Sequence, residues 1–219
     1  LQIQNELSTP GMPSSILTMV VIGAEFIVFV IWYFILVRKE DKSHLKVSMN
    51  IWNVVKIIIL AVAVQLTITL LLNVILPYTG NVYTDYMKHM EGLVGAVNIP
   101  TIITTVILAP IAEECMFRGI TMKIMGKYAP LMAANILQAA LFGLYHMQLV
   151  QGIYAFAIGL VLGYVAIKTK SILTAILLHM GINGLSFLVD PVVTEDMLSH
   201  EIICIVAAVI FAVVSIVIM

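Results

Sequence analysis

Two adjacent carboxylates, Glu113 and Glu114, follow a long apolar stretch, and Arg118 comes four residues after the second of them. No residue in the stretch 99–112 is charged. An ionisable side chain inside a membrane segment costs roughly 2.5–3.5 kcal/mol on insertion scales and is a functional hypothesis by default. Two such side chains together make this stretch the first candidate for chemistry.

Two further pairs of polar or aromatic residues have the same spacing. Phe142 precedes His146 by four residues, and His179 precedes Asn183 by four. Residues four apart lie on one face of a helix. With a rise of about 1.5 Å per residue, the pairs can meet near the middle of a membrane, although His146 fits this depth least well. We therefore expect three helices to present these residues to one cavity.

The residue types suggest a division of roles among the acidic groups. A carboxylate and a neutral imidazole around one water can take its proton and generate a nucleophile. Neighbouring helix residues point about 100° apart, so Glu113 and Glu114 cannot do the same job. Glu114 is placed to pair with Arg118. Glu113 is then the freer base, acting with His146.

The remaining pairs complete a hydrolytic site. His179 and Asn183 can donate hydrogen bonds to a developing oxyanion. Phe142, one turn before His146, could wall the substrate path. A single Glu-Arg pair could be a purely structural ion pair, but three pairs on three helices favour a water-activating hydrolase site. For Cys115 we expect packing rather than nucleophilic chemistry.

The composition places this site inside a membrane. The chain is 62% apolar and 11% charged, whereas a soluble domain carries about a quarter charged residues. The net charge of −1 argues against a nucleic-acid partner, and the partner implied is the lipid bilayer. Cys115 and Cys204 both lie in apolar runs, so no disulfide framework is expected.

A spanning helix needs about 20 apolar residues, and the chain offers about seven such segments. The predicted fold is all-α, a polytopic transmembrane helix bundle. A polar loop is expected at 78–91, and Gly152, Gly159 and Gly163 are spaced for close helix packing. The expected spans are 15–37, 54–76, 99–124, 130–146, 149–167, 171–189 and 202–219.

The basic residues predict the orientation of the bundle. Segments 38–46, 118–127 and 168–170 hold most of the Lys and Arg, and strict alternation of seven helices puts them on one side. Basic loops favour the cytoplasmic side. We expect a multi-pass cell-membrane protein with these loops and the C-terminus in the cytoplasm. The basic segment near the site favours access from there.

The three motifs, in this order, resemble those of the CPBP family of intramembrane proteases. This family includes the type II CaaX prenyl endopeptidases and the bacteriocin-processing or self-immunity proteins called Abi. The resemblance covers about 99–189, the expected catalytic core, between N-terminal helices and loops at 1–98 and a C-terminal helix at 190–219. The motifs read EECMFR at 113–118, FGLYH at 142–146 and HMGIN at 179–183.

The resemblance implies an endopeptidase that cleaves a membrane-associated peptide or protein. Glu113 and His146 would activate the water, and His179 with Asn183 would form the oxyanion site. Glu114 and Arg118 would support them. An alternative is a Zn²⁺ site with Glu113, His146 and His179 as ligands. We expect a metal-free mechanism, because Asn183 beside His179 suits hydrogen-bond donation better than metal ligation.

The small size of the chain suggests a prokaryotic member of the family. Maturation of a peptide pheromone or bacteriocin, or self-immunity, then fits better than cleavage of a prenylated CaaX protein. Two other classes compete with a protease: a non-catalytic membrane scaffold or immunity protein that binds a partner, and a proton-coupled transporter. Transporters commonly have two related halves, and the sequence has no such repeat. Leu1 is not an initiator methionine, so we expect residues to precede it.

Overall fold

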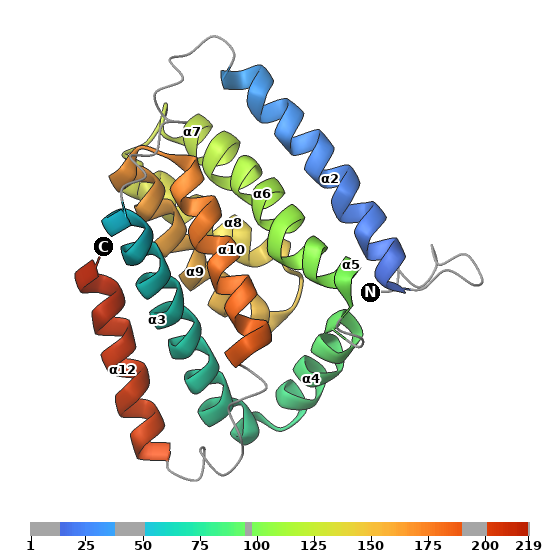
Figure 1. Ribbon diagram of the computed structural model, residues 1–219, viewed down its shortest axis with the longest axis vertical. Coiled ribbons are helices and arrows are strands. Elements are labelled where there is room, and N and C mark those ends of the chain that lie inside the picture. Colours follow the sequence, from blue (N-terminus) through green and yellow to red (C-terminus); the bar gives the residue numbers. More distant parts are fainter. Residues whose placement is uncertain (1–13, 38–50, 95–97, 190–200, 219) are drawn as a thin grey trace.

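The computed structural model describes residues 14–37, 51–94, 98–189 and 201–218, and these form helices without any strand (Figure 1). The helix of 99–125 is composite, with α-helical pieces α5 (Ile99–Ile102), α6 (Ala109–Glu114) and α7 (Met122–Met125). Two π-helical segments, η3 (Ile103–Leu108) and η4 (Cys115–Thr121), join these pieces. The other helices are α2 (Ser14–Val37), α3 (Ile51–Ile75), α4 (Asn81–Val94), α8 (Leu131–Tyr145), α9 (Leu149–Thr169), α10 (Ile172–Val189) and α12 (Glu201–Ile218).

The protein is a multi-pass helical membrane protein. Five stretches of the described chain are long and apolar enough to cross a membrane: Met19–Leu36, Ile51–Thr79, Ile99–Met125, Leu149–Thr169 and Ile172–Val189. Helix α8 is apolar but has 15 residues, about 22 Å of length, against a hydrocarbon core of about 30 Å. The predicted count of about seven spans is therefore not confirmed.

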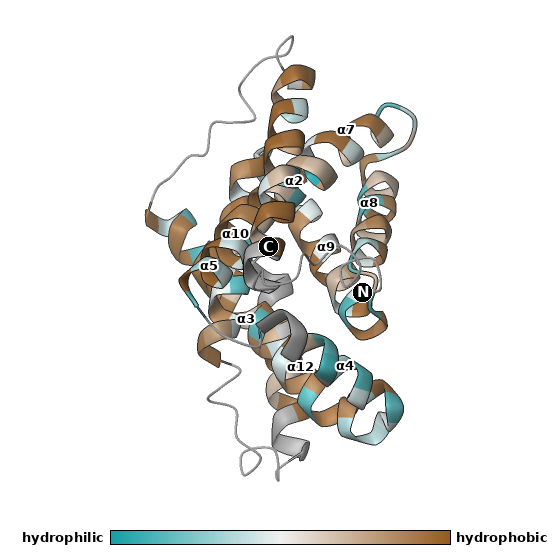
Figure 2. Ribbon diagram, turned by 90° about the vertical axis from the view of Figure 1, so that its right-hand side faces the viewer, coloured by the Kyte–Doolittle hydropathy of each residue, from teal (hydrophilic) through white to brown (hydrophobic). Residues whose placement is uncertain are grey.

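The predicted polar loop at 78–91 is wrong. A short 3₁₀ turn, η2 (Leu76–Thr79), leads directly into α4. Val82, Tyr86 and Met90 of α4 recur every fourth residue and pack in one apolar cluster with Leu76 and with Val150 at the start of α9. Their polar neighbours face outward, so α4 is an amphipathic helix across one end of the bundle, where Figure 2 shows it mixed in polarity.

Helices α8 and α9 form a closely packed antiparallel hairpin. A Cβ added at Gly143 would lie 2.6 Å from the carbonyl oxygen of Gly152, and one at Gly159 would lie 3.1 Å from Cα of Ala139. Small residues let helices approach this closely in lipid, as predicted from the glycine spacing. The hairpin packs on α3 and α10 through a core that includes Leu162 and Leu178.

Helix α2 covers the outer side of the composite helix (Figure 1). Its Tyr33 is buried against Cys115, Ile120 and Ile172. On the opposite side of the molecule α12 packs on α3, and Thr67 Oγ1 donates to the carbonyl of Ala208 at 3.4 Å. The outward faces of these helices are apolar, as expected of surfaces that contact lipid.

Candidate active site

The two adjacent carboxylates lie on α6, between the two π-helical segments. In η3 the N–H of Ala109 donates to the carbonyl of Thr104, and in η4 the N–H of Met122 donates to that of Phe117. Both bonds join residues five apart. Such π-helical turns are rare in proteins overall, and those that occur are often found at functional sites.

Glu114 and Arg118 form a fully buried ion pair. Arg118 Nη1 donates to Oε1 of Glu114 at 2.7 Å, and both side chains are 0% exposed. Nη2 of Arg118 donates to the carbonyl of Gly159 at 3.1 Å. The guanidinium carbon lies 4.6 Å from the centroid of the Phe142 ring. The pair expected from the four-residue spacing thus also ties the composite helix to α8 and α9.

A buried amide network continues from this ion pair. The Gly159 carbonyl also accepts from Gln138 Nε2 at 3.0 Å, and the same nitrogen donates to Asn135 Oδ1 at 2.7 Å. Asn135 Nδ2 donates to the carbonyl of Leu160 at 3.1 Å. These side chains of α8 bind the α9 backbone next to Arg118. The network therefore fixes the position of the carbonyl that accepts from the ion pair.

His179 lies between the two carboxylates. Its Nδ1 is 2.9 Å from Oε1 of Glu114, and its Nε2 is 3.7 Å from Oε2 of Glu113. An ionised carboxylate only accepts hydrogen bonds, so Nδ1 carries a proton and Nε2 faces Glu113. The Glu113 side chain is 15% exposed. Glu113 therefore keeps a freer carboxylate than Glu114, and its nearest imidazole is His179 rather than the expected His146.

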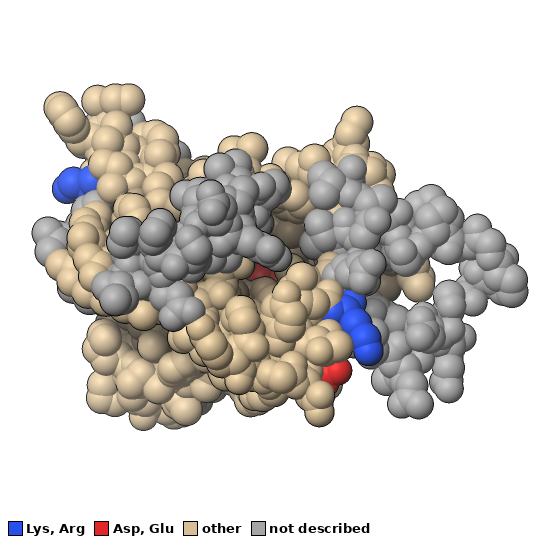
Figure 3. Space-filling view, turned by 90° about the horizontal axis from the view of Figure 1, so that it is seen from below, with Lys and Arg blue, Asp and Glu red and all other residues tan. Residues whose placement is uncertain are grey.

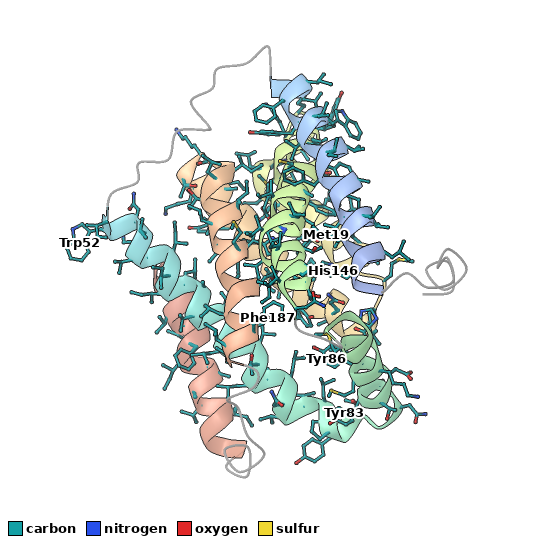
Figure 4. The ribbon with its side chains drawn as sticks, turned by 45° about the vertical axis from the view of Figure 1, so that its right-hand side comes forward. Met19, Trp52, Tyr83, Tyr86, His146 and Phe187 are labelled. Carbon is teal, nitrogen blue, oxygen red and sulfur yellow. The ribbon has the colours of Figure 1, made fainter. Side chains whose placement is uncertain are left out.

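His146 enters the site from the end of α8. Its Nδ1 lies 2.8 Å from the carbonyl of Phe142. A carbonyl accepts only, so Nδ1 is the protonated nitrogen and Nε2 is left as a proton acceptor. Figure 4 shows His146 at mid-height of the bundle, above Tyr83 and Tyr86 of α4.

The Phe142 ring packs against both imidazoles. Its centroid is 4.8 Å from that of His146 and 5.7 Å from that of His179. The Phe142 residue is only 1% exposed. Phe142 is thus a buried ring that contacts both imidazoles and the guanidinium of Arg118, and its role in walling the substrate path stays a prediction.

Asn183 lies one turn beyond His179 on α10. Its Nδ2 donates to the carbonyl of Thr105 in η3 at 3.0 Å. The expected oxyanion donor thus has one of its two amide hydrogens engaged with the composite helix.

A second polar contact lies beside the site, and the sequence could indicate its acid but not the partner of that acid. Tyr145 donates from its hydroxyl to Oε2 of Glu25 on α2 at 2.7 Å, and its ring centroid is 5.9 Å from that of His146. A lone acid within the first apolar run was the available signal. Its partner lies 120 residues away, so spacing could not identify it.

The alternative zinc ligands are only partly arranged for a metal. Both imidazoles have Nδ1 held by an oxygen, and His179 Nε2 faces Glu113 Oε2 at 3.7 Å. An imidazole oriented through Nδ1 in this way suits a metal ligand as well as a water-binding base. Within the described ranges, however, no three His, Cys, Asp or Glu side chains are grouped to hold an ion.

The fold and the site define a class: a helical membrane protein with a carboxylate and two imidazoles inside its bundle. Residues 95–185 match the family model described as type II CAAX prenyl endopeptidase Rce1-like. This match confirms the resemblance carried by the three motifs, and the family implies an endopeptidase of the CaaX-protease type. No curated protein and no solved structure gave a significant match.

Proposed function

We propose that this protein is an intramembrane endopeptidase that hydrolyses a peptide bond of a membrane-associated peptide or protein. The observation that carries the proposal is His179 placed between Glu113 and Glu114. Glu114 is engaged in the buried ion pair, whereas the partly exposed Glu113 remains available to react. A purely structural cluster has no need of this division.

The reaction begins with a water held by Glu113 and Nε2 of His146. Both groups can accept a proton, and the water oxygen then attacks the carbonyl carbon of the substrate. The proton later passes to the amine nitrogen as the C–N bond breaks, which leaves a carboxylate and an amine. His179 Nε2, when it carries a proton, and Asn183 stabilise the negative oxygen that forms in between.

We propose that substrate reaches the site from the end of the bundle where α4 lies. Helix α9, which begins three residues after His146, contacts α4 there, since His89 of α4 bonds Gln151 of α9 at 3.1 Å. Figure 3 views this end and shows part of an acidic residue recessed among residues other than Lys, Arg, Asp and Glu. Toward the opposite end η4 is filled by buried residues: Cys115, Phe117, Arg118, Gly119 and Ile120. This proposal replaces the cytoplasmic access that the sequence favoured.

The proposal has three finer parts. The protein spans the cell membrane with its C-terminus and basic segments in the cytoplasm. Its substrate belongs to bacteriocin or pheromone maturation, or to self-immunity. Its mechanism needs no metal. The competing function is a non-catalytic membrane scaffold or immunity protein that binds a partner.

A peptide library tests the function and the metal together. The protein in lipid nanodiscs is incubated with the library, and mass spectrometry compares the products with and without EDTA. We expect the same cleavage products in both, at rates within about twofold. Products that vanish with EDTA and return with Zn²⁺ would instead support ligation by Glu113, His146 and His179. A binding partner captured without any cleavage would favour the scaffold.

A further inference from the structure

The carbonyl of Thr105 lacks the hydrogen-bond donor that its own helix would normally supply. In η3 the N–H of Ala109 goes to the carbonyl of Thr104, five residues earlier. The next bond in this register would run from residue 110 to the carbonyl of Thr105. Residue 110 is a proline, which has no N–H. An unsatisfied carbonyl away from water costs about 1–3 kcal/mol, so an outside donor is favoured.

Asn183 supplies that donor from the neighbouring helix. Its Nδ2 lies 3.0 Å from the carbonyl oxygen of Thr105. A carboxamide nitrogen carries two hydrogens in one plane. When one of them is fixed on Thr105, the direction of the other is fixed as well. A Cβ added at Gly184 would lie 3.5 Å from Val106 Cγ1, so the α10 backbone is closely packed on η3 at this level.

We propose that Pro110 is a positioning residue for the reaction. By withholding an N–H, it leaves the Thr105 carbonyl free to hold the Asn183 carboxamide, whose second hydrogen then points at the oxyanion. This inference rests on the proposed function, in which Asn183 stabilises that oxyanion. In this proposal Pro110 acts on the reaction only through Asn183.

The alternative explanation is that Pro110 only bends the helix. A proline-to-alanine change distinguishes this bending from release of the Thr105 carbonyl. Pro110→Ala restores an N–H that can bond Thr105 within the helix and displace Asn183. Pro100→Ala is the matched control. Pro100 lies in the first turn of the same composite helix, where an N–H has no intrahelical acceptor in any case.

The kinetic test is a double-mutant cycle on peptide cleavage in nanodiscs. We expect Pro110→Ala to lower kcat by about tenfold or more, the order of loss that misplacing a catalytic donor causes, with KM within twofold. Pro100→Ala should match wild type. In an Asn183→Ala background, Pro110→Ala should change kcat by less than twofold, because the group that it positions is already gone. Equal fold-losses in both backgrounds would overturn the inference.

An experimental structure of Pro110→Ala gives a readout that does not depend on activity. We expect Asn183 Nδ2 to leave the Thr105 carbonyl and the N–H of residue 110 to replace it. An unmoved Asn183 would overturn the inference even if kcat fell. An Asn183→Ala variant with wild-type kcat would instead contradict the oxyanion role in the proposed function. The structure of Pro110→Ala would still test whether Pro110 keeps Asn183 bonded to the Thr105 carbonyl.

Discussion

Glu113 and Glu114 are neighbours in the chain but have different surroundings. Oε1 of Glu114 accepts from both Arg118 and His179, at 2.7 and 2.9 Å, without any exposure of the side chain. The Glu113 side chain is 15% exposed, and its Oε2 lies 3.7 Å from His179 Nε2. Glu114 therefore holds the site together, and Glu113 is left to react.

Glu114→Gln tests this structural role. The variant keeps the shape of the side chain but leaves the Arg118 charge buried without its partner. Removing one member of a buried pair costs about 3–5 kcal/mol, and we expect a loss of that size in the free energy of unfolding, measured in mixed detergent with SDS. Glu113→Gln is the control and should stay within about 1 kcal/mol of wild type. Equal losses in the two variants would contradict the assignment.

Tyr145 secures α2 beside the site through its bond to Glu25. Tyr145→Phe removes only the hydroxyl, and the lost bond should cost about 1–3 kcal/mol because Glu25 keeps an unmatched oxygen. The same unfolding measurement tests it. Tyr128→Phe serves as the matched change, since Tyr128 is 87% exposed. If both variants unfold like wild type, the Tyr145–Glu25 bond does not stabilise the bundle.

Among the elements, the α8–α9 hairpin depends most on close backbone contact. Gly143→Ala would place a methyl group 2.6 Å from the Gly152 carbonyl oxygen, which forces the helices apart. Overpacking of this kind costs about 1–3 kcal/mol, and the shift should also lower activity because His146 ends α8. Gly23→Ala on α2 has nothing within 4 Å of the new Cβ and should be neutral. Thermal unfolding of the two variants, followed by a cleavage assay, makes the comparison.

Apart from α4, the positions of the helices could be read from the sequence, with ends within about three residues. Apolar runs that stop at charges or prolines mark such ends directly. Helix α4 was missed because its polar composition hides an apolar face that only tertiary packing on Val150 reveals. The spanning count is not confirmed, because α8 has 15 residues and a spanning helix needs about 20.

The site was predictable where it depends on one helix. Glu114 and Arg118 are four apart on the same helix, so their spacing alone implied the pair. His179 reaches Glu114 across 65 residues of sequence, and Asn183 reaches Thr105 across 78. Spacing placed these residues in a common interior but could not give their partners. That the Thr105 carbonyl has no donor within its own helix follows from the π-helical hydrogen bonding of η3, and no residue pattern in the sequence predicted that bonding.

At the scale of the whole molecule, the bundle has two chemically different ends. Lys123 lies near the end of the composite helix and Lys127 lies in the turn that follows it, whereas α4 with its Asp85 lies at the other end of the bundle. We expect Lys127→Cys, in a cysteine-free background, to react with an impermeant maleimide only from the cytoplasmic side of the membrane. Asp85→Cys should react only from outside. Reversed labelling would overturn the predicted orientation, and labelling of both from one side would contradict the fold.

The central claim is that Glu113 activates water inside this bundle. The most direct measurement compares peptide cleavage by wild type and by Glu113→Gln in the same nanodiscs, with unfolding curves showing that both are folded. General-base catalysis is worth about 10²–10⁴-fold, and we predict a loss of that size in kcat. Cleavage by Glu113→Gln at the wild-type rate, at the same bonds, would contradict the account.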